Sequence, residues 1–401
     1  MTRILFVDDE PKILMALRRS LRSLRHQWEM VFAEGGVAGL EECASAAFDV
    51  VVSDARMPGM EGPEFLAEVA RLYPDTVRMI LSGQCSRNSV LRCVAVAHQF
   101  LSKPCDPTIL KNALQRVCDA RDQFRQSSYR PAISRIQQLP TEQGAYKQLV
   151  KNAKSPEVNT DTLAAVLVRD VGMTGRVMQL VSSGFFGSPQ RVESPSAAAK
   201  SLGQEIIGAL VKSTSFFELP GEERVEEGFH RLNEHSLAVA SAAKQIAKSL
   251  TNDPVVIGDA YVSGMLHELG VFALAGKPID LEKELLAGEI SPEAFAFESL
   301  AKLDDEWQLD PGGYLAALWG LPDPVIQAIS YHRVPDRCSG EALIPLIAVH
   351  VANAFLEPRC GAWNKSANHL NKDFLQQAGY ADYLELWRSI REFGPREGVL
   401  Q

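Results

Sequence analysis

The stretch "VVSDARMPGMEG", from Val51 to Gly62, decides the fold of the first part of the chain. Mostly apolar residues run into a single carboxylate, Asp54, and the chain then breaks at Pro58 and Gly59. A short apolar run followed by proline and glycine is typical of a buried strand that ends in a loop. The pattern therefore predicts a strand with the carboxylate of Asp54 at its end.

Similar apolar runs recur along residues 1–120 and alternate with amphipathic segments. The runs are "RILFVDD", "EMVFAE", "FDVVVSD", "TVRMILSG" and "HQFLSKP", and the helical segments include "GGVAGLEECASAA", "GPEFLAEVARLY" and "SRNSVLRCVAVA". Strands that alternate with helices predict a doubly wound α/β domain with a five-stranded parallel sheet. The nearly continuous Ile, Leu and Val content of the strands indicates a sheet that helices cover on both faces.

Polar residues stand at the ends of four of these predicted strands. Asp8 and Asp9 follow the first strand, Asp54 ends the third, Ser82 ends the fourth and Lys103 follows the fifth. In such sheets the active crevice lies beyond the carboxyl ends of the strands. Crowded carboxylates favour a hard cation such as Mg²⁺, and a carboxylate can accept a phosphoryl group when a metal and a lysine neutralise its oxygens. Each residue alone could be an ordinary turn or helix cap.

Residues 1–120 resemble a response-regulator receiver domain of two-component signalling, because "FVDDE", "VVSDARMPGMEG", "MILSG" and "FLSKP" fall in the order of that family. The resemblance implies that Asp54 is the phosphoacceptor, that Asp8, Asp9 and Asp54 hold Mg²⁺, that Ser82, Lys103 and Phe100 form the switch and phosphate-contacting set, and that the Lys103–Pro104 bond is cis. Ser82 is a mild departure, since threonine is commoner there. The resemblance also implies a sensor histidine kinase or a phosphotransfer protein as partner.

The rest of the chain has a different pattern. We place a helical linker at residues 121–136 and an all-α output domain at 137–401, because helical patterns continue almost throughout and are interrupted by proline-containing turns. The polar helix that leaves the first domain is predicted to stop near Pro131. A further helix is predicted around "DYLELWRSIREF".

Histidines and carboxylates of this second part are candidates for chemistry. They are His230, His235, His267 with Glu268, Tyr331 with His332, His350 and Asn353. A hydrolytic metal centre needs several such ligands from different helices and an open position for water. A single histidine on an apolar face is more often a hydrogen-bonded core residue.

Residues 137–356 resemble the HDOD branch of the HD superfamily, on "AAVLVRDVGMTGRVMQLVSSGFFG", "SPSAAAKSLGQEIIGALV", "EHSLAVASAAKQIA", "GMLHELG", "LAALWGLPDPVIQAISYHRVP" and "LIAVHVANAF". Catalytic HD proteins use histidines, an adjacent His-Asp pair and a late Asp. His235, His267 and His332 match these positions, but Glu268 and Asn353 stand where aspartates are expected. The resemblance therefore implies a degenerate, non-catalytic domain without a metal, which signals to an unidentified protein.

Two other functions remain open for this domain. One is an HD-type metal-dependent phosphohydrolase of nucleotides or cyclic dinucleotides that the receiver switches, and the other is a pocket that binds a nucleotide without cleaving it. Phosphorylation is expected to alter the association of the two halves, or of two copies of the chain in a homodimer.

Composition limits the partners. The chain carries 41 Lys and Arg against 50 Asp and Glu, and this net charge of −9 disfavours direct DNA binding. The basic segment "PKILMALRRSLRSLRHQW" is read as a solvated helix face or as a docking surface for an acidic protein. No apolar run approaches a membrane span, and seven cysteines without a C-x-x-C pair indicate a reducing compartment. We therefore expect a cytoplasmic protein, and the resemblance to a receiver domain implies a role in bacterial signalling.

Overall fold

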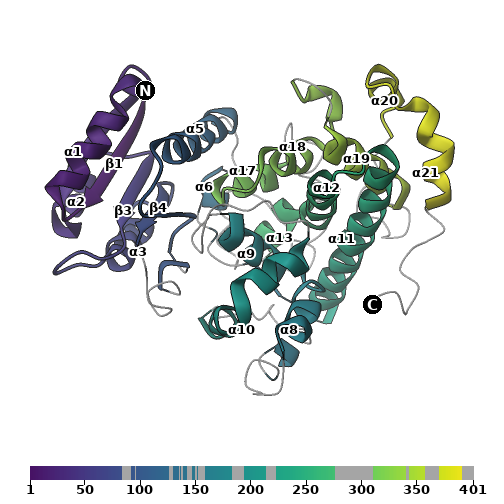
Figure 1. Ribbon diagram of the computed structural model, residues 1–401, viewed down its shortest axis with the longest axis horizontal. Coiled ribbons are helices and arrows are strands. Elements are labelled where there is room, and N and C mark those ends of the chain that lie inside the picture. The colour runs from purple at the N-terminus through teal and green to yellow at the C-terminus, as the bar shows by residue number, and fades with distance from the viewer. Residues whose placement is uncertain are drawn as a thin grey trace, which may run out of the picture.

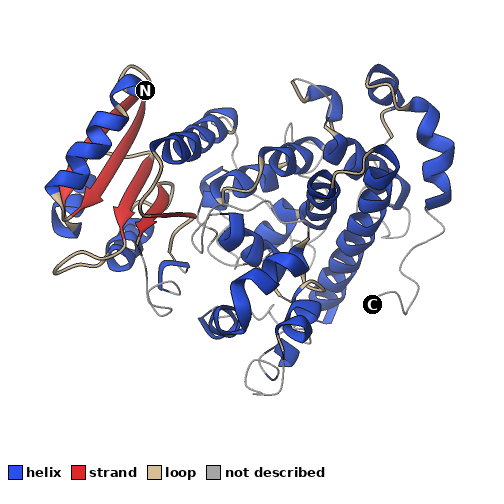
Figure 2. Ribbon diagram, in the orientation of Figure 1, coloured by secondary structure: helices blue, strands red, loops and turns tan. Residues whose placement is uncertain are grey.

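The computed structural model shows a sheet-containing domain joined to a larger helical domain (Figure 1). It describes residues 1–83, 92–94, 96–125, 130–134, 136, 139–141, 147–149, 151, 159–182, 194–213, 223–275, 310–339, 343–356 and 370–390. Figure 2 shows the strands confined to the first domain.

The first domain contains the predicted five-stranded parallel sheet, which confirms the fold class. The strands are β1 (Thr2–Asp8), β2 (Trp28–Glu34), β3 (Val50–Asp54), β4 (Val77–Ser82) and β5 (Gln99–Ser102). Their order is β2-β1-β3-β4-β5, so the chain reverses its direction of travel across the sheet between β1 and β3. Every residue of β3 and β4 is buried, as expected for central strands covered on both faces.

Helices flank this sheet. They are α1 (Pro11–Ser20), α2 (Gly36–Ser45), α3 (Gly62–Leu72) and α5 (Pro107–Gln123). A capping box between Glu61 and Glu64 begins α3, and the carboxylate of Asp106 caps α5 by accepting from the Thr108 amide. The helix predicted from "SRNSVLRCVAVA" falls mostly outside the described residues. Within its described part, residues 92–94 are helical.

The exit from the first domain differs from the sequence prediction. Instead of continuing to Pro131, α5 ends at Gln123, and a new short helix, α6 (Arg130–Ser134), begins just before that proline. The ring of Phe124 packs on Tyr314 of the helical domain, with centroids 5.4 Å apart. Helix α5 ends where Phe124 turns into the core that the two domains share. Helix α6 can begin just before Pro131 because proline is well tolerated in a first helical turn.

Every regular element in the described part of residues 130–390 is helical, as predicted. After α6 the α-helices are α8 (Thr160–Leu167), α9 (Val171–Ser182), α10 (Pro195–Ser213), α11 (Glu223–Leu250), α12 (Pro254–Leu266), α13 (Leu269–Ala275), α17 (Pro311–Leu318), α18 (Asp323–Tyr331), α19 (Ile344–Leu356), α20 (Lys372–Gln377) and α21 (Leu384–Ile390). The last of these confirms the helix expected around "DYLELWRSIREF", whose final residues lie outside the described chain. No helix among the described residues combines the length and the apolarity that crossing a bilayer requires.

Buried side chains form two apolar cores. The first core runs without interruption from the sheet, through Ile133 and Leu139, to α9 and α17 of the helical domain. The second core joins α11, α12, α19 and the C-terminal helices. The short helix α18 contributes to both, because Val325 and Ile329 belong to the first core and Ala328 belongs to the second.

Buried polar groups connect the two domains at the start of β5. The Arg78 amide donates to Nδ1 of His98 (3.0 Å), and the opposite ring nitrogen of His98 contacts the Ser134 carbonyl (2.9 Å). The Gln179 side chain of α9 donates to the His98 carbonyl (2.7 Å). These partners require the neutral imidazole, with its proton on Nε2. Burial lowers the pKa of His98 well below its usual value, and the charge of Arg78 lowers it further.

We predict that His98 makes the stability of this junction depend on pH. The unfolded chain protonates this histidine below a pH of about 6.5, whereas the folded chain keeps it neutral. Its contribution to stability is therefore complete above that pH and is lost as the pH falls toward the lower folded-state pKa, by at most about 1.4 kcal/mol per pH unit. Urea unfolding between pH 7 and 5 should show a weaker pH dependence for His98→Gln than for wild type.

The matched control is His26→Gln, which changes an exposed histidine of the same domain. Its unfolding free energy should follow the wild-type pH dependence. Equal slopes for His98→Gln and wild type would contradict the assignment.

Candidate functional site

The carboxyl edge of the sheet brings the predicted acidic residues together. Because Val7 of β1 pairs with Ser53 of β3, Asp8 and Asp54 end neighbouring strands. Both side chains are largely buried, whereas Asp9 is exposed beside them. Gly62, at the start of α3, packs directly against the Asp54 carbonyl, where a Cβ would collide with the carbonyl oxygen. The absence of a side chain at Gly62 therefore allows α3 to begin this close to the end of β3.

Lys103 forms ion pairs with both carboxylates. Its Nζ lies 2.7 Å from Oδ2 of Asp8 and also contacts Oδ1 of Asp54. The other oxygen of Asp54 accepts from the Arg56 amide at 2.7 Å. Burial lowers the pKa of Lys103, but the hydrogen bonds to Asp54 and Asp8 outweigh it and raise the pKa above its ordinary value. The lysine thus remains charged between the two acids.

The other predicted members of this site lie on the next two strands. Ser82 ends β4 and pairs with Ser102 of β5, and its carbonyl accepts from the Lys103 amide at 2.6 Å. Phe100 is fully buried in β5. The Lys103–Pro104 bond is cis, as expected. The sheet therefore presents an acid pair, a hydroxyl and an ammonium group along one edge, while the role of each in phosphoryl transfer stays a prediction.

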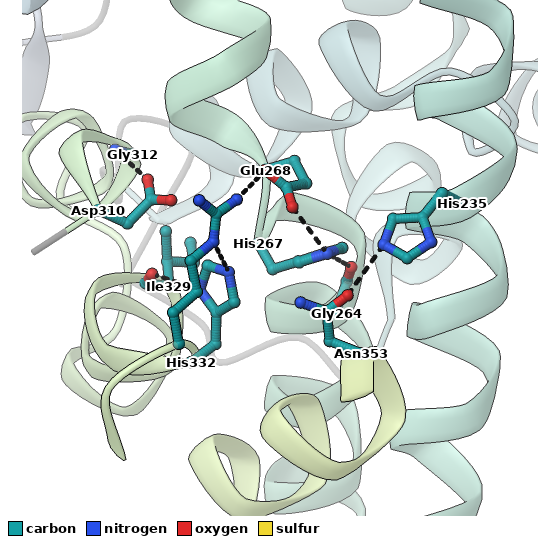
Figure 3. A network of polar contacts seen from close by, with 10 residues as sticks. His235, Gly264, His267, Glu268, Asp310, Gly312, Ile329, His332 and Asn353 are labelled. Carbon is teal, nitrogen blue, oxygen red and sulfur yellow. Dashed lines mark hydrogen bonds and ion pairs between the residues drawn. The ribbon is translucent and has the colours of Figure 1, made fainter. Parts of the chain in front are cut away.

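A second polar cluster lies inside the helical domain. The histidine cluster consists of His235 on α11, His267 and Glu268 after α12, His332 after α18 and Asn353 on α19. Figure 3 shows these five side chains turned toward one another. The ring of His267 lies 5.2 Å from that of His235 and 5.1 Å from that of His332, between centroids. The five positions compared with the catalytic HD pattern are thus brought together and buried.

Hydrogen bonds fix the tautomers in this cluster. Nδ1 of His267 faces the Gly264 carbonyl (2.7 Å), and Nδ1 of His332 faces the Ile329 carbonyl (2.9 Å). Each of these nitrogens must carry the proton, so each Nε2 presents a lone pair toward the cluster. His235 contacts the Asn353 side-chain oxygen through Nε2 at 2.9 Å. Among the described residues, Nε2 of His267 has no hydrogen-bond partner.

Arg333 places a positive charge in the histidine cluster. Its Nε donates to Nε2 of His332 (3.0 Å), and one terminal nitrogen donates to Oε2 of Glu268 (2.7 Å). The guanidinium therefore occupies the His332 lone pair and one Glu268 oxygen, so neither atom is free to bind a metal ion. Arg333 is not among the residues predicted from the sequence, although its place directly after His332 was a usable signal.

The charges of the cluster follow from this arrangement. Burial opposes ionisation of Glu268, but the charge of Arg333 and the adjacent histidines lower its pKa to about 2. Burial lowers the pKa of His235 and His332, and lowers that of His267 well below its usual value. The cluster therefore contains one carboxylate, one guanidinium and neutral imidazoles at neutral pH.

A reduced set could still hold a cation. His235, His267 and Glu268 offer ligand atoms that all lie within 4.8 Å of one another. Two histidines and one carboxylate are a ligand set that catalytic zinc sites use. Against this, the Arg333 guanidinium lies hydrogen-bonded to Glu268 and repels an incoming cation.

The remaining sequence candidates lie outside the cluster. His230 is exposed, and its Nε2 lies 3.5 Å from Oε1 of Glu234. His350 is buried, contacts the His332 carbonyl through Nδ1 (2.7 Å) and accepts from the Asn371 amide, which is a packing role. Asp310, which is not among the residues predicted from the sequence, lies next to the cluster in Figure 3 and caps α17. Burial raises its pKa well above the usual range, and the charge of Glu268 raises it further.

Comparisons with protein families agree with this division of the chain. The response regulator receiver domain matches residues 4–115, and the HDOD domain matches residues 139–335. The chain is a two-component response regulator with an HDOD output domain. The expected resemblances are thereby confirmed, whereas the boundaries set at residues 120 and 136 stay predictions.

Two curated proteins are similar to parts of this regulator. An uncharacterized protein of Treponema pallidum is 26% identical over 237 residues, which are 57% of this chain and 44% of that protein. The transcriptional regulatory protein GlrR of Escherichia coli is 31% identical over 134 residues, which are 32% of this chain and 29% of that protein. The chain spans less than half the length of either of these curated relatives.

Among solved structures, this regulator is similar to the signal receiver domain of an HD domain-containing protein from Pseudomonas fluorescens Pf-5. The identity is 31%, the match covers 30% of this chain and 98% of that one, and the TM-score is 0.29.

We predict that Arg333 is the residue that allows Glu268 to be buried. Arg333→Met should lower the free energy of unfolding by about 3–5 kcal/mol, because it leaves a buried carboxylate without its counter-charge. The double variant Arg333→Met/Glu268→Gln should recover most of that loss. Chemical unfolding of both variants measures the difference.

A control for this experiment is Lys372→Met, which removes an exposed positive charge from the same domain. Its stability should stay within about 0.5 kcal/mol of wild type. If the double variant were no more stable than Arg333→Met, the pairing would not be what stabilises Glu268.

Proposed function

We propose that this regulator receives a phosphoryl group on Asp54 and transmits that state through an HDOD domain that binds another protein and does not catalyse hydrolysis. The observation that carries the receiving half is the double ion pair of Lys103 with Asp8 and Asp54. The observation that carries the output half is the Arg333 guanidinium bound to His332 and Glu268.

Phosphoryl transfer to this site needs a nucleophile, charge neutralisation and access. An oxygen of Asp54 attacks the phosphorus of the donor, the bond to the donor's leaving group breaks, and an acyl phosphate forms. Lys103 already lies against Asp54 and can contact the added oxygens. Asp8, Asp9 and Asp54 supply the carboxylate oxygens that suit Mg²⁺, which would neutralise the charge that builds up on the transferred group.

The phosphoryl group brings new acceptor oxygens to the carboxyl edge of the sheet. Ser82 ends the strand next to Asp54 and can donate to such an oxygen, while Phe100 lies buried in the strand beyond. A sensor kinase or a phosphotransfer protein is the expected source of the phosphoryl group. A cytoplasmic location, a homodimer and the lack of direct DNA binding stay predictions.

The alternative function is an HD-type phosphohydrolase. The specific observation in its favour is the group of His235, His267 and Glu268 described above. A metal-activated water requires that the ion be held firmly and that its charge not be opposed. Arg333 opposes it from within hydrogen-bonding distance of Glu268, so we rank this function second.

The first test is Mg²⁺-dependent phosphorylation. Incubation with a small phosphodonor should add one hydroxylamine-labile phosphoryl group per chain, and Asp54→Asn should remove that labelling. Asp9→Asn should raise the Mg²⁺ concentration needed for half-maximal labelling, because it removes one hard ligand charge. Asp119→Asn, on the exposed side of α5, is the control and should label like wild type. Equal labelling of Asp54→Asn would exclude this residue as the acceptor.

The second test asks whether the output domain is a metal enzyme. The full chain, purified without chelators, should contain Fe, Mn and Zn well below one ion per chain and should not hydrolyse linear or cyclic nucleotides with any of them added. Removal of the internal charge in Arg333→Gln should increase metal affinity at His235, His267 and Glu268. Stoichiometric metal in wild type, with turnover that His267→Ala abolishes, would establish the phosphohydrolase instead.

A further inference from the structure

The hairpin formed by α17 and α18 lies between the receiver and the histidine cluster. The α17–α18 hairpin runs from Asp310 to Tyr331 and turns at Gly320, whose φ of 72° is in the left-handed region. The two helices pack closely, since a Cβ at Gly313 would collide with the side chain of Ser330. The Asp310 amide also donates to the Ser330 carbonyl at 3.1 Å. These contacts hold the hairpin together as one unit.

One side of the hairpin contacts the receiver. Arg116 of α5 forms an ion pair with Asp323 at 2.7 Å, and the Gln123 side chain donates to the Tyr331 hydroxyl at 2.5 Å. The receiver residues are seven positions apart and the hairpin residues eight, so each pair of contacts spans about two helical turns, or roughly 10–12 Å. Two contacts in this order fix both the direction and the register of α18 along α5.

Buried groups add to this contact. Tyr314 of α17 is fully buried, packs on Phe124 and lies 3.2 Å from the Ser134 hydroxyl, between oxygens. Gln99, the first residue of β5, packs so tightly on the turn that a Cβ at Gly320 would meet its amide. These buried contacts hold the turn of the hairpin against the receiver, and the Arg116 and Gln123 contacts set the position of α18 along α5.

The other side of the hairpin forms part of the histidine cluster. His332 directly follows Tyr331, and its amide still bonds to the Ala328 carbonyl at 3.0 Å. Arg333 is the next residue, and its guanidinium reaches Glu268. The hydroxyl that contacts the receiver and the imidazole that belongs to the cluster are therefore carried by adjacent residues, Tyr331 and His332. A rotation or shift of α18 must displace both.

We propose that the α17–α18 hairpin couples the two sites, so that docking of the receiver holds Arg333 in the histidine cluster and release of the receiver withdraws it. This proposal rests on the proposed function only in taking phosphorylation of Asp54 as the signal. Val325 and Ile329 of α18 belong to the first apolar core and Ala328 belongs to the second, so a shift of α18 changes the packing in both. The region that changes toward the output partner is then the surface around α18 and the cluster.

The experiment observes the cluster while the receiver contact is changed. We would record the imidazole ¹⁵N signals of the histidine-labelled full chain for wild type and for Arg116→Ala/Gln123→Ala. The double variant should shift the Nε2 signal of His332 or split it into two, because this nitrogen loses its hydrogen bond from Arg333. Gln115→Ala is the matched control, because it removes a glutamine of the same helix that bonds only to Asp119 among its described partners.

The reverse coupling is tested from the cluster side, since linkage between two sites is reciprocal. Arg333→Lys, which keeps a positive charge but cannot make both hydrogen bonds, should accelerate backbone amide exchange in α5. Exchange in α11 should stay at the wild-type rate, which separates a loosened receiver from a poorly folded domain. Unchanged His332 signals in the receiver variant, or unchanged α5 exchange in Arg333→Lys, would overturn the coupling.

Beryllofluoride separates this proposal from the proposed function. If the receiver variants move the His332 signal and beryllofluoride does not, the hairpin couples the domains but Asp54 does not control it. If beryllofluoride moves the His332 signal and the receiver variants do not, Asp54 controls the output by another route and the hairpin proposal is wrong. Movement in both experiments supports both.

Discussion

A buried carboxylate needs a nearby positive charge, and both candidate sites of this protein are organised by that constraint. Lys103 pairs with Asp8 and Asp54 at the edge of the sheet, and Arg333 pairs with Glu268 among the helices. Removing one partner of a buried pair costs far more than the pair contributes, so each basic residue holds its surroundings in place. Any event that changes the charge at one of these positions must therefore rearrange the groups around it.

The two sites are also joined by packing. One apolar core continues from the sheet into the helical domain, so the receiver is not attached by a linker alone. The buried contacts of His98 and Tyr314 lie inside this junction, where a small displacement cannot be absorbed by solvent. A change at the carboxyl edge of the sheet has a continuous packed route to the helices that carry the histidine cluster.

The sequence predicts the parts of this structure that depend on local pattern. Parallel strands end at a common edge, so Asp8, Asp54 and Lys103 had to meet once the five strands were recognised. The histidine cluster could be proposed because His235, His267 and His332 match a family pattern. Neither pattern predicts the contacts of Gln123 with Tyr331 or of Arg116 with Asp323, because the residues of each pair are more than 200 positions apart in the sequence. Arg333 is not selected in advance because an arginine is ordinarily a solvated surface residue.

The choice of an arginine as the internal cation has consequences for a signalling domain. A metal ion binds to several ligands at once and holds the helices that carry them, whereas a guanidinium is carried by one backbone segment and leaves with it. On the coupling proposed for the α17–α18 hairpin, the charge that completes the cluster directly follows an element that the receiver contacts. The guanidinium also lowers no water pKa and leaves no open coordination position, so it can stabilise the closed arrangement without supplying hydrolytic chemistry. An output that consists of a change of shape needs only this stabilisation and no hydrolytic chemistry.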